Sequence, residues 1–211
     1  MGNARRALVL IDVQQEYFSA DGPLAIAYPP REDSIRQITA AIDAANDSDL
    51  PVVVVRHEYP AGAPVFAAGS ANGELHPEVA ERAKSEWRQV TKNVASIFAD
   101  NDLAQWLRDQ SVDTVTFAGY MTNNCVLASA AAAEPLGIAV EVLSDATGAI
   151  HLANEAGSVS AQQLHETLMT LLHSNFAAVA STKSWIAAAT DGSPLPKSSL
   201  GTSAVQGRAA Y

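Results

Sequence analysis

Six short apolar runs, separated by segments of helical periodicity, constrain the fold of this 211-residue chain more than any other feature. Five runs are rich in Val, Leu, Ile or Phe without strict alternation, which is typical of parallel strands buried on both faces. The remaining run, RQVTK, is weaker, and we expect it at an edge of the sheet. In chain order, the runs cover residues 7–12, 51–57, 88–92, 114–119, 139–145 and 176–182.

Apolar residues between the runs recur at helical spacing, so that strands alternate with helices. The clearest faces are formed by Ile35, Ile38, Ile42 and Ala45, by Leu103, Trp106 and Leu107, and by Leu164, Leu168, Leu171 and Leu172. This alternation predicts an α/β fold with three α/β/α layers and a six-stranded parallel sheet. We assign the strand order 3-2-1-4-5-6, which places a ligand crevice beyond the carboxyl ends of strands 1 and 4.

The length and the 48% hydrophobic content are enough for one well-buried core. We therefore expect one domain over residues 1–190. Residues 191–211 are polar and rich in Pro, Ser and Gly, which predicts a flexible tail. Residues 59–73 show no periodicity and are expected to form a long loop, a kind of segment that often serves as a lid or a pocket wall.

Charge and cysteine content narrow the function further. A formal net charge of −10 argues against a nucleic-acid partner and favours neutral or cationic small molecules. A single cysteine cannot form an intramolecular disulfide, and the first residues lack the pattern of a secretory signal, so we expect a cytoplasmic protein. No apolar run approaches the length of a membrane span, and no membrane association is expected.

The lone cysteine, Cys125, has two interpretations: a small core residue, or a nucleophile. The predicted topology brings it, at the end of the fourth run, close to Asp12 at the end of the first. Cys125 would lie in the first turn of a helix, whose backbone N–H groups could stabilise a thiolate or an oxyanion. Asp12 could then accept the thiol proton, although capping a turn or pairing with a lysine is the commoner role for such an acid taken alone.

Three motifs in this order resemble those of the isochorismatase-like cysteine hydrolases, the superfamily that includes nicotinamidases, N-carbamoylsarcosine amidase and ureidoacrylate hydrolases. They are LVLIDVQQEYF, TKNVASIFAD and GYMTNNCV, and the resemblance extends over residues 6–189. The matching positions are Asp12, Gln14 and Tyr17 in the first motif, Lys92, Ser96 and Phe98 in the second, and Gly119, Thr122 and Cys125 in the third.

The resemblance implies a catalytic triad of Asp12, Lys92 and Cys125. Nothing in the periodicity brings Lys92 to the other two, so its role is carried by the resemblance alone. The family also places a cis peptide bond between Tyr120 and Met121, and an oxyanion hole formed by the backbone N–H groups of Met121 and Cys125. Substrate-pocket positions by the same resemblance, or by their place in the loop, are Gln14, Tyr17, Phe66 and Tyr120; for Trp87, ordinary packing is the preferred interpretation.

No metal or other cofactor is expected. Nicotinamidases carry an Asp-x-His pair after the second strand, whereas this chain has RHEYPAG there. His57 is interpreted as a pocket-wall or core residue and His76 as a helix-start residue, because two histidines without a fixed spacing are weak grounds for a metal site.

The resulting prediction is an amidohydrolase that cleaves a C–N bond of a small amide, ureido or lactam compound through a thioester. A cysteine at the third motif favours this over the vinyl-ether hydrolysis of true isochorismatases, which need no nucleophile. The alternative from another class is a non-hydrolytic α/β binding or thiol-sensing module. Members of the family usually self-associate, so a homo-oligomer, a dimer or a tetramer, is expected.

Overall fold

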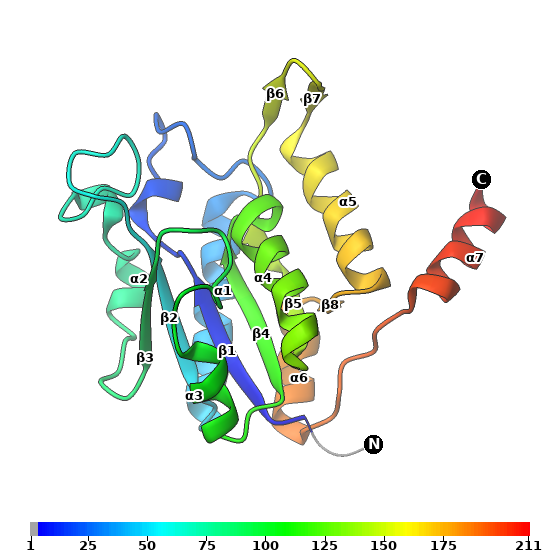
Figure 1. Ribbon diagram of the computed structural model, residues 1–211. Helices are drawn as coiled ribbons and strands as arrows, with labels where there is room; N and C mark the ends of the chain where they lie inside the picture. The colour runs from blue at the N-terminus through cyan, green and yellow to red at the C-terminus, as the bar shows by residue number, and fades with distance from the viewer. Residues whose placement is uncertain (1–3) are drawn as a thin grey trace.

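A six-stranded parallel sheet forms the centre of the protein, as described by a computed structural model for residues 4–211 (Figure 1). Its strands follow the order β3-β2-β1-β4-β5-β8, which confirms the predicted order and the edge position of RQVTK. The sheet strands are β1 (Arg6–Ile11), β2 (Val52–His57), β3 (Arg88–Lys92), β4 (Thr114–Tyr120), β5 (Ala139–Gly148) and β8 (Ala178–Ala180). An antiparallel hairpin, β6 (Leu152–Asn154) and β7 (Gly157–Val159), interrupts the numbering and was not predicted.

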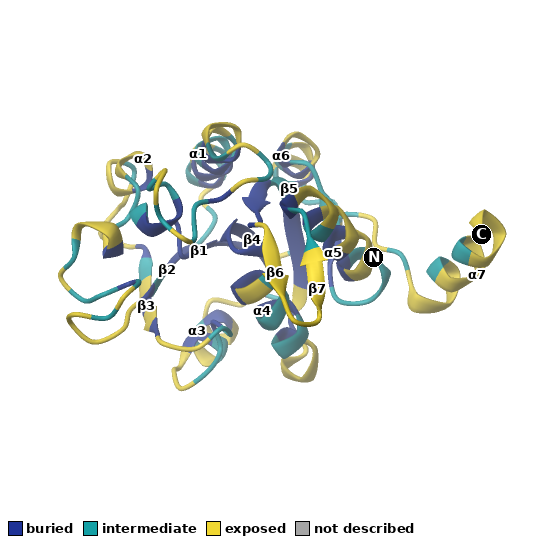
Figure 2. Cartoon of the chain, turned by 90° about the horizontal axis from the view of Figure 1, so that it is seen from above, coloured by how far each residue is buried: buried dark blue, intermediate teal, exposed yellow. Residues whose placement is uncertain are grey.

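Helices cover both faces of the sheet, as the view from above shows (Figure 2). One apolar core lies between the sheet and α1 (Arg31–Asp47), α2 (Pro77–Ala80) and α6 (Thr182–Asp191). The other lies between the sheet and α3 (Leu103–Asp109), α4 (Leu127–Ala133) and α5 (Ala161–Ser174). Short helical turns occupy Gln15–Tyr17, Ala71–Gly73, Thr122–Val126 and Glu134–Leu136. The three-layer α/β/α architecture expected from the sequence is therefore present.

Local sequence explains where the principal helices begin and which face they bury. Ile38 and Ile42 of α1 are fully buried against the sheet, at the spacing that the periodicity predicted. Helix α5 begins at a capping box, in which the Ser160 hydroxyl accepts from the Gln163 backbone and the Gln163 side chain accepts from the Ser160 backbone. These signals act locally, so they are readable before any tertiary contact is known.

A buried ion pair ties α6 to the sheet. Arg6 on β1 makes a bidentate contact with Glu141 on β5, with both side chains almost fully withdrawn from solvent. The same carboxylate accepts hydrogen bonds from Thr116 and from the indole of Trp185, which belongs to α6. Because every polar atom of the carboxylate is engaged, this cluster fixes α6 in place rather than forming a reactive site.

Gly119 allows β4 to approach β1 at the switch point of the sheet. It adopts φ +112°, and a Cβ added there would lie 2.1 Å from the carbonyl oxygen of Ile11. Only glycine tolerates both the positive φ and this contact. The close approach brings the segment after β4, which carries Cys125, next to the residue after Ile11, which is Asp12.

Residues 192–211 contain a helix, α7 (Leu200–Ala210), that extends away from the layers (Figure 1). The sequence predicted a flexible tail from residue 191 onward and no helix there. Ser199 caps the start of α7 by accepting from the backbone of Thr202. Its mobility stays a prediction. Among the described residues, no helix combines the length and the apolar character needed to cross a membrane.

Candidate active site

Three side chains converge on the ammonium group of Lys92, and together with it they come from the carboxyl ends of four adjacent strands. Its Nζ lies 2.6 Å from Asp12 Oδ2, 2.9 Å from His57 Nδ1 and 3.3 Å from Cys125 Sγ. A lysine ammonium has three N–H donors, and these three contacts use all of them. Lys92 is therefore a bridge between the carboxylate, the imidazole and the thiol.

The strand order explains how residues so far apart in sequence meet. Lys92 ends β3 and is paired in register with His57, which ends β2. Asp12 follows β1, the next strand, and its φ of +51° turns the chain away from the sheet. Neighbouring strands lie about 4.8 Å apart, so the long Lys92 side chain can reach across β2 to the end of β1.

The turn that carries Cys125 is held from two sides. Thr122 to Val126 form a π-type turn that continues into α4, and the peptide bond between Tyr120 and Met121 is cis. The hydroxyl of Thr122 is bonded to Nδ1 of His165 on α5, at 2.9 Å. On α4, Ser129 donates to the carbonyl oxygen of Cys125 at 2.6 Å. These contacts fix the thiol over the end of β1.

Burial controls the protonation of the cluster. Asp12, Lys92 and Cys125 are exposed by 0%, 4% and 1%. Burial raises the pKa of the Cys125 thiol to about 12, and the Asp12 carboxylate acts in the same direction. Burial also raises the pKa of Asp12, although Lys92 opposes this shift. The sequence predicted a stabilised thiolate, whereas the structure favours the neutral thiol, because a thiolate would place a second negative charge beside Asp12.

His57 is neutral in this cluster, and one of its ring nitrogens has no partner. Burial and the adjacent Lys92 ammonium lower the pKa of His57 to about 4. Since Nδ1 accepts from Lys92, the proton of the neutral ring is on Nε2. Within residues 4–211, neither His57 Nε2 nor Asp12 Oδ1 has a hydrogen-bond partner, although both atoms are buried. The cluster therefore keeps one free donor and one free acceptor.

Gln14 acts on the backbone around His57. Its side-chain oxygen accepts from the His57 backbone at 2.8 Å, and its side-chain nitrogen donates to the carbonyl oxygens of His57 and Gly73. These bonds use both N–H groups of the amide. The sequence placed Gln14 in the substrate pocket; these contacts instead give it the role of holding the end of β2 and the loop of residues 59–73 together.

Aromatic side chains surround the cluster. The ring centroid of Tyr17 lies 5.3 Å from that of Phe66 and 5.3 Å from that of Tyr120, and Phe66 lies 5.0 Å from His57. Phe66 is buried, so the loop of residues 59–73 closes over this part of the site. Tyr120 points its hydroxyl to Ser34 on α1, at 2.7 Å. Of the predicted pocket residues, Tyr17 and Phe66 thus have their side chains beside the cluster.

Comparison with known proteins identifies the family of this chain. The family model described as the isochorismatase domain matches residues 6–184. The chain belongs to the isochorismatase family. It is 45% identical to an isochorismatase-family protein of Burkholderia xenovorans LB400, whose crystal structure superposes with a TM-score of 0.94 over 99% of both chains.

Two further members of the isochorismatase family lie somewhat farther from this chain. The structure of a family hydrolase from Oleispira antarctica is 34% identical, with a TM-score of 0.79 over 89% of this chain and 98% of that one. A secreted isochorismatase effector of Verticillium dahliae is 35% identical over 141 residues, which is 67% of this chain and 71% of the effector. The family resemblance drawn from the three motifs is thereby confirmed.

The cluster in this isochorismatase-family chain has three atoms that could bind a metal, on Asp12, His57 and Cys125, all within 4.8 Å of one another. The ammonium of Lys92 lies within hydrogen-bond distance of all three residues. It already supplies the cation between them, and a metal ion would have to displace it. The residues present therefore fit a lysine-centred cluster and do not fit a metal centre.

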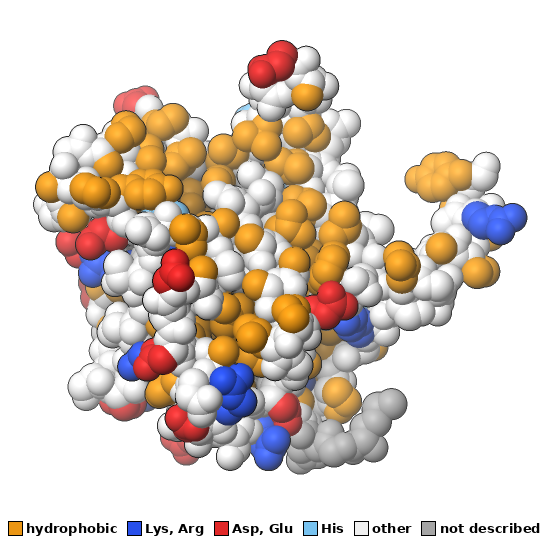
Figure 3. Space-filling model, in the orientation of Figure 1, with side chains coloured by type: hydrophobic (Ala, Val, Ile, Leu, Met, Phe, Trp, Pro, Cys, Tyr) orange, Lys and Arg blue, Asp and Glu red, His pale blue; other side chains and the backbone are white. Residues whose placement is uncertain are grey.

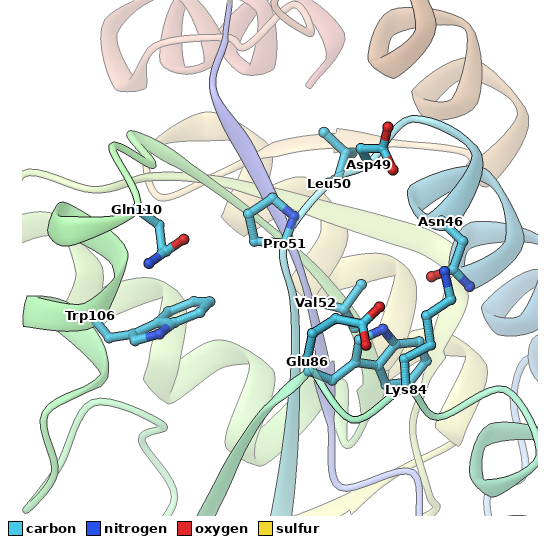
Figure 4. A pocket seen from close by; sticks show the side chains of 10 residues that line it. Asn46, Asp49, Leu50, Pro51, Val52, Lys84, Glu86, Trp106 and Gln110 are labelled. Carbon is cyan, nitrogen blue, oxygen red and sulfur yellow. The ribbon is translucent and has the colours of Figure 1, made fainter.

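Trp87 lies at the opposite end of the strands from Cys125. It lines a hollow of about 240 Å³ at the amino ends of β2 and β3. Trp106, Pro51 and the first residue of β2, Val52, line the same hollow (Figure 4). Because this hollow is separated from Lys92 by the length of a strand, Trp87 has a packing role, which was the preferred interpretation from the sequence.

Sequence reasoning missed two residues of the site. His57 was interpreted as a wall or core residue, yet its ring contacts Lys92 directly. The available signal was its place at the end of the second strand, beside the strand that Lys92 ends. Sequence reasoning assigned no role to His165, which is buried and is hydrogen-bonded to the Thr122 hydroxyl. No local pattern distinguishes it from other histidines on a helix.

Proposed function

We propose that this isochorismatase-family chain is a cysteine-dependent amidohydrolase, in which Cys125 is the nucleophile, Asp12 the general base and Lys92 the cation that links them. The single observation that carries the proposal is the ammonium of Lys92, which contacts both Asp12 Oδ2 and Cys125 Sγ inside a buried cluster. A nucleophile, a base and an orienting group within hydrogen-bond reach are what covalent catalysis requires.

In the first half of the reaction, the Cys125 sulfur attacks the carbonyl carbon of the substrate while its proton passes to Asp12. The C–S bond forms and the carbonyl oxygen becomes an oxyanion. The C–N bond then breaks, and the leaving nitrogen takes the proton from Asp12. Ammonia or an amine departs, and a thioester on Cys125 is left.

In the second half, water attacks the thioester carbonyl and gives a proton to Asp12. The C–S bond breaks, and the proton returns to sulfur as the acid product leaves. Asp12 and Cys125 are thereby restored, and the net reaction consumes one water for each C–N bond broken. No oxidant, reductant or metal is needed to balance it.

The protonation of the resting site supports general-base catalysis. Burial keeps the pKa of Cys125 high, so during hydrolysis the thiol attacks the substrate carbonyl as Asp12 removes its proton. Lys92 stays beside both groups, and it offsets the negative charge whether that charge is on the carboxylate or on the sulfur.

Backbone N–H groups of Met121 and Cys125 are proposed to hold the oxyanion. Met121 follows the cis bond, and its N–H has no hydrogen-bond partner within the described part of the chain. A free donor next to the nucleophile is suited to a negative charge that exists only during the reaction.

The substrate is proposed to be a small, neutral or cationic amide, ureido or lactam compound. The triad is buried, and Tyr17 and Phe66 lie around it, so a substrate is flanked by aromatic rings and enters when the loop of residues 59–73 moves. The free His57 N–H and the free Asp12 oxygen would orient its polar atoms. A cytoplasmic location stays a prediction from the sequence.

Vinyl-ether hydrolysis is the second candidate, because a relative bears the name isochorismatase. That reaction does not use a sulfur nucleophile, so the two candidates respond differently to loss of the thiol. A thiol-sensing module with no hydrolysis is the third possibility that an assay must address.

The test is ammonia release from a panel of small amides, carbamoyl and ureido compounds and lactams, with pyruvate release from isochorismate measured in parallel. We expect C–N hydrolysis that Cys125→Ala abolishes, and a mass increase on Cys125 equal to the acyl group in acid-quenched samples. Pyruvate release that survives Cys125→Ala would establish ether hydrolysis instead. Turnover of no compound in the panel would favour the sensing module.

A further inference from the structure

The segment of residues 192–211, called the arm below, leaves the body of the protein in a fixed direction. The backbone carbonyl of Ser193 accepts a hydrogen bond from the buried Arg6, and Leu195 packs against the core beside α1 and α6. Pro194 and Pro196 flank that leucine, and each fixes its own φ near −65°. The start of the arm is therefore anchored to the body, and the two prolines restrict the direction in which it leaves.

Helix α7, at the end of the arm, has few of the packing contacts that stabilise a short helix. It has 11 residues, two of them glycine, and none of its residues is buried. Isolated helices shorter than about 12 to 15 residues are marginal in water, and each interior glycine costs about 1 kcal/mol relative to alanine. Leu200 and Val205 are 64% and 70% exposed. Helix α7 therefore gains little stability from burial within this chain.

The body of the same chain covers only a narrow stripe of α7. Ser203 and Gly207 are its half-buried residues, and they face α5. Between α5 and the arm lies an open hollow of about 780 Å³ with a partly apolar wall. Its lining includes Met169, Val179, Pro196 and Ala210. Figure 3 shows the arm apart from the body, with hydrophobic side chains on its surface.

The charge of the arm is opposite to that of the body. Residues 192–211 carry two basic residues, Lys197 and Arg208, and no acidic residue. All 23 acidic residues of the chain lie before the arm, so the body alone is more acidic than the net charge of −10 implies. An arm of this charge is attracted to a second copy of the same acidic body.

From these observations we infer that the arm docks onto a second copy of this chain. In a two-fold dimer, the arm of one copy packs beside α5 of the other, and its own hollow receives the partner's arm. In this reciprocal arrangement, Leu200 and Val205 of each copy are covered by the other copy. The related crystal structure that spans 99% of this chain at a TM-score of 0.94 includes the arm residues, so their outward placement is a shared feature.

The first test is the mass of the full-length protein in solution, measured by light scattering and by sedimentation over a range of concentrations. We expect twice the chain mass, or an even multiple of it, for the wild type. Val205→Asp should raise the dissociation constant at least about tenfold, since it places a charge in the covered face. Leu136→Asp is the matched control: it changes an exposed leucine, 38% accessible, outside the arm, and should leave the mass unchanged.

The second test is hydrogen exchange of the α7 amides. In the dimer they should be protected, and in Val205→Asp they should exchange near the rate of an unfolded peptide, because α7 alone is too short to persist. A monomeric wild type overturns the inference, and so do α7 amides that stay protected in a monomer. An unchanged dissociation constant in Val205→Asp, or a loss of the dimer in Leu136→Asp, places the interface elsewhere and also overturns it.

Discussion

The ammonium of Lys92 lies 2.6 Å from the carboxylate of Asp12, and both side chains are withdrawn from solvent. The pair is buried next to a thiol and a neutral imidazole, so no other charge compensates either partner. Removing one partner would leave the other as an isolated charge in a medium of low dielectric constant. This relationship gives the first prediction.

Lys92→Met is expected to lower the rate of hydrolysis by at least about a thousandfold, because Asp12 loses the cation that keeps it ionised and Cys125 loses a donor. It should also lower the free energy of unfolding by about 3–5 kcal/mol, the usual loss when one partner of a buried pair is removed. Urea unfolding and a steady-state assay measure the two effects.

The double variant Asp12→Asn with Lys92→Met is the control for that stability loss. It removes both charges, so it should be more stable than Lys92→Met alone while having no activity. If the double variant is the less stable of the two, the pair does not act as a compensated buried unit.

The second prediction concerns the thiol. Because burial raises the pKa of Cys125 to about 12, its alkylation by iodoacetamide should accelerate steadily through pH 9 without reaching a plateau. Asp12→Asn removes the adjacent negative charge and leaves Lys92 beside the sulfur, so at pH 8 it should react faster than the wild type while hydrolysis is lost. A wild-type plateau below pH 8 would mean that the resting site holds a thiolate.

The third prediction is a pH-dependent contribution of His57 to stability. The unfolded chain binds a proton on this histidine near pH 6.5, whereas burial and Lys92 lower the pKa to about 4 in the folded protein. Between these values the unfolded state binds more protons, so stability is lost as the pH falls from about 6.5 to about 4. The wild type should therefore lose more of its melting temperature than His57→Gln over this range.

Comparison of the two proteins at several pH values makes that test specific. The difference in melting temperature between wild type and His57→Gln should be constant above pH 7 and should shrink below pH 6.5. His165→Gln is measured for comparison. Burial lowers the pKa of His165 as well, but this residue lies on α5 and does not contact Lys92. A difference for His57→Gln that is the same at pH 7.5 and pH 4.5 contradicts the prediction.

The fourth prediction distinguishes a residue that stabilises the fold from the residues that act in catalysis. Glu141→Gln leaves the buried Arg6 without its carboxylate and should cost about 3–5 kcal/mol in the free energy of unfolding. The matched control is Asp113→Asn, which breaks the exposed pair with Arg5 and should cost less than about 1 kcal/mol. Folded Glu141→Gln should keep the rate of hydrolysis per molecule, and a specific loss of that rate would connect this cluster to the chemistry.

Much of the fold follows from patterns that act locally. Runs of β-branched and aliphatic residues indicated the six sheet strands, and strand order followed from general rules of parallel sheets. The hairpin of β6 and β7 was missed because its strands have three residues each and are exposed, which leaves no apolar pattern to read. Helix α7 was missed because Ser, Gly and Pro dominate the segment around it.

For the site, the sequence by itself determined that Asp12 and Cys125 would meet, since strand ends on either side of the switch point are neighbours in any sheet of this order. Only the tertiary structure decided how the site is charged. The place of Lys92 between Asp12, His57 and Cys125, and the burial that keeps the thiol and the imidazole neutral, depend on distances across four strands and on the loss of solvent. Dielectric environment is a property of the packed whole, and no spacing along the chain encodes it.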